Sequence, residues 1–165
     1  MKRKLLIVST LIVILAIAVS VVYAAGNDDL AKVRAATEKF RKIEDVEAAG
    51  YGLVPDLDHC FENPGVGDMG YHYINTAILD TTLDPLNPEA IVYAPDNKGD
   101  LKLAAVEYIV PQTDWDAAGN TTPPALLGQT FHLNENLHVY VLHAWIWKNN
   151  PAGIFEDWNP KVSCP

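Results

Sequence analysis

Hydrophobic and polar positions alternate with a period of two over much of the second half of the chain, which is the pattern of β-strands. The longest such run, residues 137–147, places six side chains on one face: Leu137, Val139, Val141, His143, Trp145 and Trp147. The other face is also largely apolar. The run is therefore predicted to be a central strand covered on both sides, with His143 as its polar exception.

Four further strands are predicted at residues 69–76, 90–94, 101–110 and 129–133, with a hairpin turn over 95–100. Two of them also carry a polar exception. His72 shares a strand face with Ile74, and Glu107 lies between Ala105 and Ile109 on a face of its strand. An isolated carboxylate is costly in such a place unless it is paired, protonated or bound to a metal. Residues 112–128 are predicted to form a long loop at the rim of the fold.

Ahead of the strands, apolar residues recur at helical spacing from Leu30 to Val46, and Gly50 ends the pattern. This predicts one amphipathic helix over about 20 residues, with an N-cap at Asn27 or Asp28. Its apolar stripe needs a surface to cover. The predicted fold is therefore α+β: an N-terminal amphipathic helix packed on a mainly antiparallel sheet or small half-open β-barrel.

The first 25 residues have the features of a signal peptide. A basic start, Lys2 to Lys4, precedes an apolar run over 5–22, and small residues follow at Ala24 and Ala25. An uncleaved membrane anchor is the alternative, because the run is just long enough to span a bilayer. Both interpretations place residues 26–165 outside the cytoplasm as a single exported domain, whether extracellular, periplasmic or attached to the cell envelope.

Charge and cysteine content fit this location. Loss of the leader removes three of the 12 basic residues and none of the 21 acidic ones, which leaves a net charge of −12. Such an acidic domain does not favour nucleic acid as a partner, nor an anionic membrane once the leader is cleaved. Cys60 and Cys164 are the only cysteines, and two cysteines in an exported domain are expected to form a disulfide. A pair of thiolate metal ligands is the alternative.

The three polar exceptions, His72, Glu107 and His143, form the candidate functional site. Two histidines and a carboxylate from separate strands are a ligand set for a divalent transition metal such as Zn, Fe, Mn or Cu. The same residues could work as an acid–base pair without metal, or could be buried structural residues. Strand register, on which their convergence depends, cannot be deduced from the sequence.

Three functions follow from these possibilities. The first is a binding module that holds a metal ion or a small apolar ligand on an aromatic sheet face. The second is a metal-dependent enzyme that uses the same three residues and a bound water. The third is a structural or interaction protein of the cell envelope that has no metal. No phosphate-binding glycine loop, serine-nucleophile motif or C-x-x-C motif is present.

Four segments after the leader are Met69-Gly70-Tyr71-His72-Tyr73, Val106-Glu107-Tyr108, His143-Ala144-Trp145-Ile146-Trp147 and Asn150-Pro151-Ala152-Gly153. Taken together, they resemble a family of uncharacterised exported bacterial proteins. The resemblance covers most of the chain after the leader. It implies an exported single-domain bacterial protein, and it carries no activity, because none is assigned to that family.

Overall fold

A computed structural model describes residues 28–165, and its centre is a six-stranded antiparallel sheet. The strand order is β1-β2-β3-β4-β8-β7. The bounds are β1 Phe61–Asn63, β2 Gly67–Ile74, β3 Ala90–Pro95, β4 Leu101–Pro111, β7 His132–Asn134 and β8 Val139–Ala144. The predicted α+β class with a mainly antiparallel sheet is confirmed. The predicted leader, residues 1–25, lies outside the described residues.

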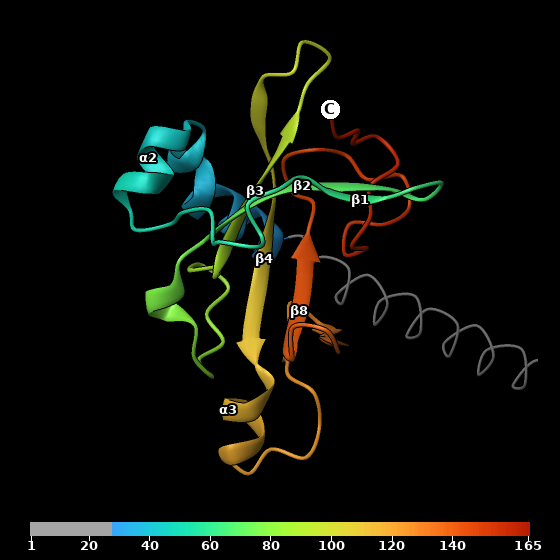
Figure 1. Ribbon diagram of the computed structural model, residues 1–165. Helices are drawn as coiled ribbons and strands as arrows, with labels where there is room; N and C mark the ends of the chain where they lie inside the picture. The colour runs from blue at the N-terminus through green and yellow to red at the C-terminus, as the bar shows by residue number, and fades with distance from the viewer. Residues whose placement is uncertain (1–27) are drawn as a thin grey trace, which may run out of the picture.

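Helical segments cover one face of this sheet, and the C-terminal tail lies on its other side (Figure 1). Residues 28–37 are helical and continue into η1, Glu38–Phe40, which α2, Ile43–Ala48, follows. The single helix expected here is thus interrupted at Arg41 and Lys42. The interruption lets the segment fold over the sheet, where its apolar side chains form a common core with those of β2, β3 and β4. This core contains Val33, Phe40 and Val46 from the helical segment, and Tyr73, Ile91, Tyr93, Val106 and Tyr108 from the strands.

The opposite sheet face carries the predicted polar exceptions and smaller apolar residues. Two apolar clusters lie on it: Val92, Ala94, Ala104, Ala105, Trp145 and Val162 in the first, and Ala90, Ile109 and Val141 in the second. The β3–β4 register shifts between Val92 and Tyr93. A bulge of this kind increases local twist and bends the strand. The sheet is curled into a half-open barrel whose inner face holds the polar residues.

The connection after β4 contains more regular structure than the loop expected over 112–128. A short helix α3, Gln112–Ala117, follows β4 directly, and a small two-stranded sheet pairs β5, Ala125–Leu126, with β6, Gln129–Thr130. The indole Nε1 of Trp115 donates to the carbonyl of Thr122 at 2.8 Å. This contact ties the helix to the segment that returns towards the sheet.

Strand β8 ends at Ala144, three residues before the end of the predicted strand. Beyond it the chain bends, because the amides of Trp147 and Lys148 both donate to the carbonyl of Ala104, at 3.1 and 2.9 Å. Trp147 consequently lies on the helical side, where its indole Nε1 donates to Thr37 Oγ1 at 3.1 Å. The prediction that Trp147 shares the face of His143 is therefore wrong, whereas Trp145 packs on that face beside Val92.

The predicted disulfide between Cys60 and Cys164 is confirmed, with a Cα–Cα distance of 5.8 Å. It joins the end of the tail to the residue before β1. Asp68 and Asn159 add backbone hydrogen bonds in both directions between β2 and the tail. Gly67 permits this approach, because a Cβ there would lie 2.5 Å from the backbone of Asn159. The tail is thus fixed along the inner face of the sheet.

Candidate metal centre

Three strands of the sheet, β2, β4 and β8, supply the predicted site residues. Glu107 of β4 and His143 of β8 are direct cross-strand partners. His72 lies on β2, where it is paired with Val92 of β3. In a flat sheet β2 and β8, which are three positions apart, would be separated by about 14 Å. The curl of the sheet brings the ends of their side chains together on its concave face.

The polar atoms of the three side chains are in close contact. His72 Nε2 lies 3.2 Å from His143 Nε2 and 3.6 Å from Glu107 Oε2. His143 Nδ1 lies 3.5 Å from Glu107 Oε1. One donor atom from each residue can be chosen so that all three lie within 4.8 Å of one another. Two ligands of a tetrahedral zinc ion at 2.0–2.1 Å are about 3.3 Å apart, so these separations are close to those of a coordination sphere.

Small side chains from the intervening strands leave room for this convergence. Ala90 of β3 is the cross-strand partner of Glu107, and Ala105 of β4 is the partner of Val92. All three site residues are nevertheless enclosed, with exposed fractions of 5% for His72, 7% for Glu107 and 1% for His143. Ionisable groups are rarely buried to this extent unless they are paired or ligated.

Two further residues, Asp157 and His132, extend the cluster, and sequence reasoning missed both roles. His143 Nδ1 lies 3.2 Å from Asp157 Oδ1, and His132 Nε2 lies 2.9 Å from Asp157 Oδ2. Asp157 therefore bridges the buried His143 and the half-exposed His132, whose side chain is 51% accessible. His132 is on β7, as the predicted strand over 129–133 suggests, but Asp157 comes from a tail without periodicity.

Burial and neighbouring charges shift the pKa values of the cluster in different directions. Burial alone would lower the pKa of His143, but the charge of Glu107 and the hydrogen bond and charge of Asp157 outweigh it and raise that pKa above its ordinary value. Burial opposes ionisation of Asp157, yet the hydrogen bonds from His132 and His143 hold its pKa well below its usual range. The hydrogen bond to Asp157 also raises the pKa of His132.

For His72 and Glu107, burial is the largest influence on the pKa and determines the direction of its shift. Burial, reinforced by the charge of His143, lowers the pKa of His72 to about 3, so its imidazole is neutral at physiological pH. Burial raises the pKa of Glu107, with the charge of His143 acting in the opposite direction. The Nδ1 atom of His72 is buried without a hydrogen-bond partner among residues 28–165. A neutral imidazole and a buried carboxyl group can both take a further partner, either a hydrogen-bonding group or a metal ion.

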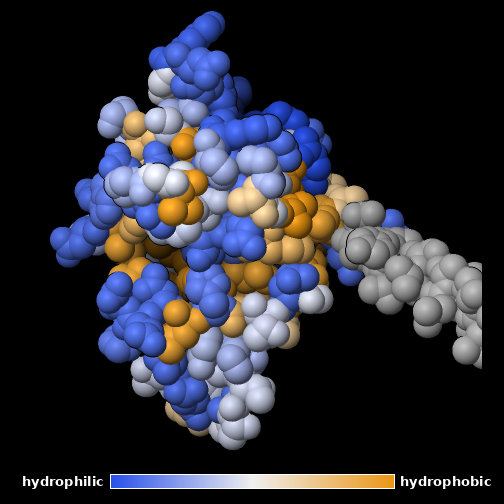
Figure 2. Space-filling model, turned by 90° about the vertical axis from the view of Figure 1, so that its right-hand side faces the viewer, coloured by the Kyte–Doolittle hydropathy of each residue, from blue (hydrophilic) through white to orange (hydrophobic). Residues whose placement is uncertain are grey.

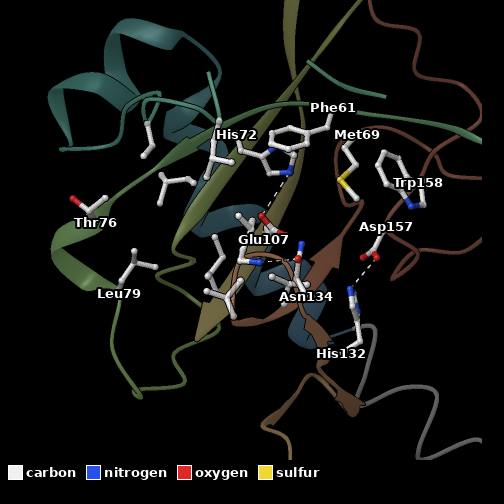
Figure 3. Close-up of a pocket in the computed structure, with 17 residues that line it drawn as sticks. Phe61, Met69, His72, Thr76, Leu79, Glu107, His132, Asn134, Asp157 and Trp158 are labelled. Atoms are coloured by element: carbon white, nitrogen blue, oxygen red, sulfur yellow. Dashed lines mark hydrogen bonds and ion pairs between the residues drawn. The ribbon is translucent and has the colours of Figure 1, made fainter. Parts of the chain in front are cut away.

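A cavity of about 300 Å³ opens beside these residues. Figure 3 shows His72 and Glu107 at its wall, and the His132–Asp157 pair to one side of them. Most of the remaining lining is apolar, from β1, β2, β4, β8 and the loop before β1. On the face of the molecule seen in Figure 2, apolar side chains are exposed across the middle, between hydrophilic residues above and below.

Neither His59 nor His138 belongs to the group of potential metal ligands within residues 28–165. The ring of His59 packs against that of Phe61, with centroids 4.5 Å apart. His138 lies in the turn before β8 with a φ of +53°. The two cysteines are joined to each other, which excludes them as thiolate ligands in this oxidised form.

Comparison with known proteins returned no match to a family model, to a curated protein or to a solved structure. Within residues 28–165, no helix has both the length and the apolar character needed to cross a bilayer. The function must therefore be inferred from the geometry of the site.

Proposed function

We propose that the protein binds one divalent transition metal ion through His72, Glu107 and His143. The observation that carries the proposal is the convergence of three buried ligand-type side chains, from three different strands, with donor atoms within 4.8 Å of one another. Burial also raises the pKa of Glu107, and a bound cation would offset the cost of keeping that carboxylate ionised inside the protein.

The donor set suits Zn²⁺, Fe²⁺, Mn²⁺ or Cu²⁺. Two imidazole nitrogens and one carboxylate oxygen are a borderline N/O set that all these ions accept. Three protein ligands leave at least one coordination position for water or a small molecule. His72 and Glu107 line the cavity while His143 lies behind them, so the proposal directs that open position towards the cavity.

In the proposed centre, Asp157 is the hydrogen-bond partner of the metal ligand His143. When His143 Nδ1 donates to Asp157, the lone pair of the neutral imidazole is on Nε2, the atom that faces His72. Carboxylate–histidine pairs of this kind orient the ring and increase the basicity of the ligand.

The proposed place of action is outside the cytoplasm. The leader-like N-terminus and the Cys60–Cys164 disulfide both support export, because disulfides persist in oxidising compartments.

A metal-dependent enzyme is the second candidate. The cavity beside His72 and Glu107 favours it, because a water bound to the metal would face any small molecule held there. Turnover of a hydrolytic or oxidative substrate by metal-loaded protein, and its loss in Glu107→Ala, would distinguish the enzyme from the binding module.

The proposal is tested by calorimetric titration of metal-free protein with Zn²⁺ and Mn²⁺. We expect one ion per chain in the wild type, and an affinity at least a hundredfold lower in His143→Ala and in Glu107→Gln. His138→Ala is the matched control, because His138 lies outside the centre, and it should bind as the wild type does. Circular dichroism of each variant establishes that it is folded. Absence of binding in the wild type, or wild-type binding in both folded site variants, would overturn the proposal.

A further inference from the structure

The cavity beside the proposed metal centre is large enough for a small organic molecule and is mainly apolar. Its volume of about 300 Å³ corresponds to about ten water molecules at about 30 Å³ each. Apolar side chains form most of its wall, among them Phe61, Met69, Leu79, Ile109, Val139 and Val141. A site of this kind gains affinity by burying a hydrocarbon body, and its few polar groups orient the ligand.

The ionisable groups of the cavity are not spread evenly over its wall. Figure 3 shows His72 and Glu107 near its middle and His132 and Asp157 to one side, while Leu79 and the uncharged Thr76 lie on the other side. A ligand that fills this space would therefore have one polar end and one apolar end. Asp157 already pairs with His132 and His143, which leaves the proposed metal as the group that can receive the polar end.

Charge indicates what that polar end is. A divalent ion and the carboxylate of Glu107 leave one formal positive charge at the centre, and the charges of Asp157 and a protonated His132 cancel in their ion pair. No Lys or Arg belongs to the described residues that line the cavity, so the metal is the unpaired positive charge that attracts an anion there. A ligand with a single anionic oxygen group would neutralise the centre and fill its open coordination position.

We propose that the cavity binds a medium-chain monocarboxylate, with its carboxylate on the metal and its hydrocarbon chain against Ile109, Val139 and Val141. This inference rests on the proposed metal site. Octanoate, with ten non-hydrogen atoms, matches the size of the cavity, whereas butyrate would leave much of the apolar wall uncovered. Each methylene buried adds about fourfold in affinity, so the four methylenes that distinguish them predict a difference of more than about a hundredfold.

The test is calorimetric titration of octanoate and butyrate into metal-free and zinc-loaded protein. We expect one octanoate per zinc-loaded chain, much weaker binding of butyrate, and at least tenfold weaker octanoate binding to the metal-free protein. Val139 lines the cavity but is not a proposed ligand, so Val139→Trp should retain zinc but lose octanoate because the larger side chain occupies the space for the ligand. Thr113→Trp adds the same side chain on α3, at an exposed position outside the cavity, and should bind both as the wild type does.

The outcomes of these titrations distinguish a failure of this inference from a failure of the proposed function. Zinc binding without octanoate binding, or octanoate binding unchanged in Val139→Trp, overturns the inference and leaves the metal site intact. Octanoate binding that is equal with and without zinc overturns the assignment of the carboxylate to the metal. Absence of zinc binding in the wild type overturns the proposed function itself, and the inference with it.

Discussion

His143 is the residue on which the site depends, because its two ring nitrogens face different partners. Nε2 faces His72 and Nδ1 faces Asp157, at 3.2 Å each. The second contact determines which nitrogen carries the proton in the neutral ring, and so which one can act as a ligand. Asp157 is therefore a positioning residue in this account, and it also raises the pKa of the ring it orients.

Replacing Asp157 with Asn should change both the affinity for metal and its pH dependence. We expect about a ten- to hundredfold loss of affinity at alkaline pH, as is typical when the outer partner of a ligand histidine is removed. Asp157 raises the pKa of His143, so its removal should lower that pKa. The pH at which the affinity for metal begins to fall, as protons compete for His143, should then move downwards. Zinc titrations across a pH series measure both effects, and an unchanged midpoint would contradict the assigned role.

The sequence predicted the three central residues because each interrupts an apolar strand face, and a buried polar side chain requires a partner. Asp157 gave no such signal, because it follows Glu156 in an aperiodic tail where acidic residues are ordinarily exposed. The predicted disulfide indicated only that the end of the tail is held beside Cys60. It did not indicate that the tail brings a carboxylate to His143.

At the scale of elements, β2 sets the position of His72, and Gly70 allows β2 to lie close to β3. Gly70 has a φ of +101°, and a Cβ there would lie 2.3 Å from the carbonyl oxygen of Tyr93. Any side chain at this position would push β2 away from β3, two residues before His72. The strand pairing that places His72 opposite Val92 therefore requires glycine.

Replacing Gly70 with Ala should lower the free energy of unfolding by more than about 2 kcal/mol, because backbone strain and a backbone clash act together. Gly65→Ala is the matched control. Gly65 also has a positive φ, of +86°, but a Cβ added there would meet nothing within 4 Å. Only the backbone strain of about 1–2 kcal/mol then remains. Urea unfolding measures both, and equal losses would show that the approach to Tyr93 contributes nothing.

The long central strands were predicted closely, whereas short strands and strand ends were not. No strand was predicted at β1, and the strand expected over 129–133 is divided between β6 and β7, which belong to different sheets. β4 and β3 match the expected runs within one residue, because their periodicity is uninterrupted and a clear turn joins them. β8 stops at Ala144 although the apolar pattern continues to Trp147. There the carbonyl of Ala104 accepts hydrogen bonds from the amides of Trp147 and Lys148. This is a tertiary contact, and a local sequence pattern cannot indicate it.

At the scale of the whole molecule, the site depends on the curl of the sheet and on the order of its strands. A half-open barrel was one of the two predicted forms of the sheet. The strand order and register that bring His72 to His143 do not follow from the sequence, because side-chain alternation identifies the faces of a strand but not its neighbours. Small residues such as Ala90 and Ala105 make the curl possible at the site, and they were not recognised as a signal. The disulfide was predictable because it follows from cysteine number and compartment.

Removal of the disulfide should affect stability much more than metal binding. The bridge spans 104 residues of sequence, for which chain entropy gives about 4–5 kcal/mol of stabilisation through the unfolded state. Other contacts hold the tail near Asp157, including the amide of Trp145, which donates to the carbonyl of Ile154 at 2.8 Å. In the double variant Cys60→Ala/Cys164→Ala we expect a large loss in urea stability and less than a threefold change in zinc affinity. A large loss of affinity in the folded variant would mean that the bridge itself positions Asp157.

Anomalous X-ray diffraction at the zinc edge, from crystals of zinc-loaded protein, tests the central claim most directly. The account predicts one strong peak per chain, about 2.0–2.2 Å from a ring nitrogen of His72, a ring nitrogen of His143 and a carboxylate oxygen of Glu107. A peak at His59 or His138 instead, or no peak while His72 and His143 remain in direct contact, would contradict it.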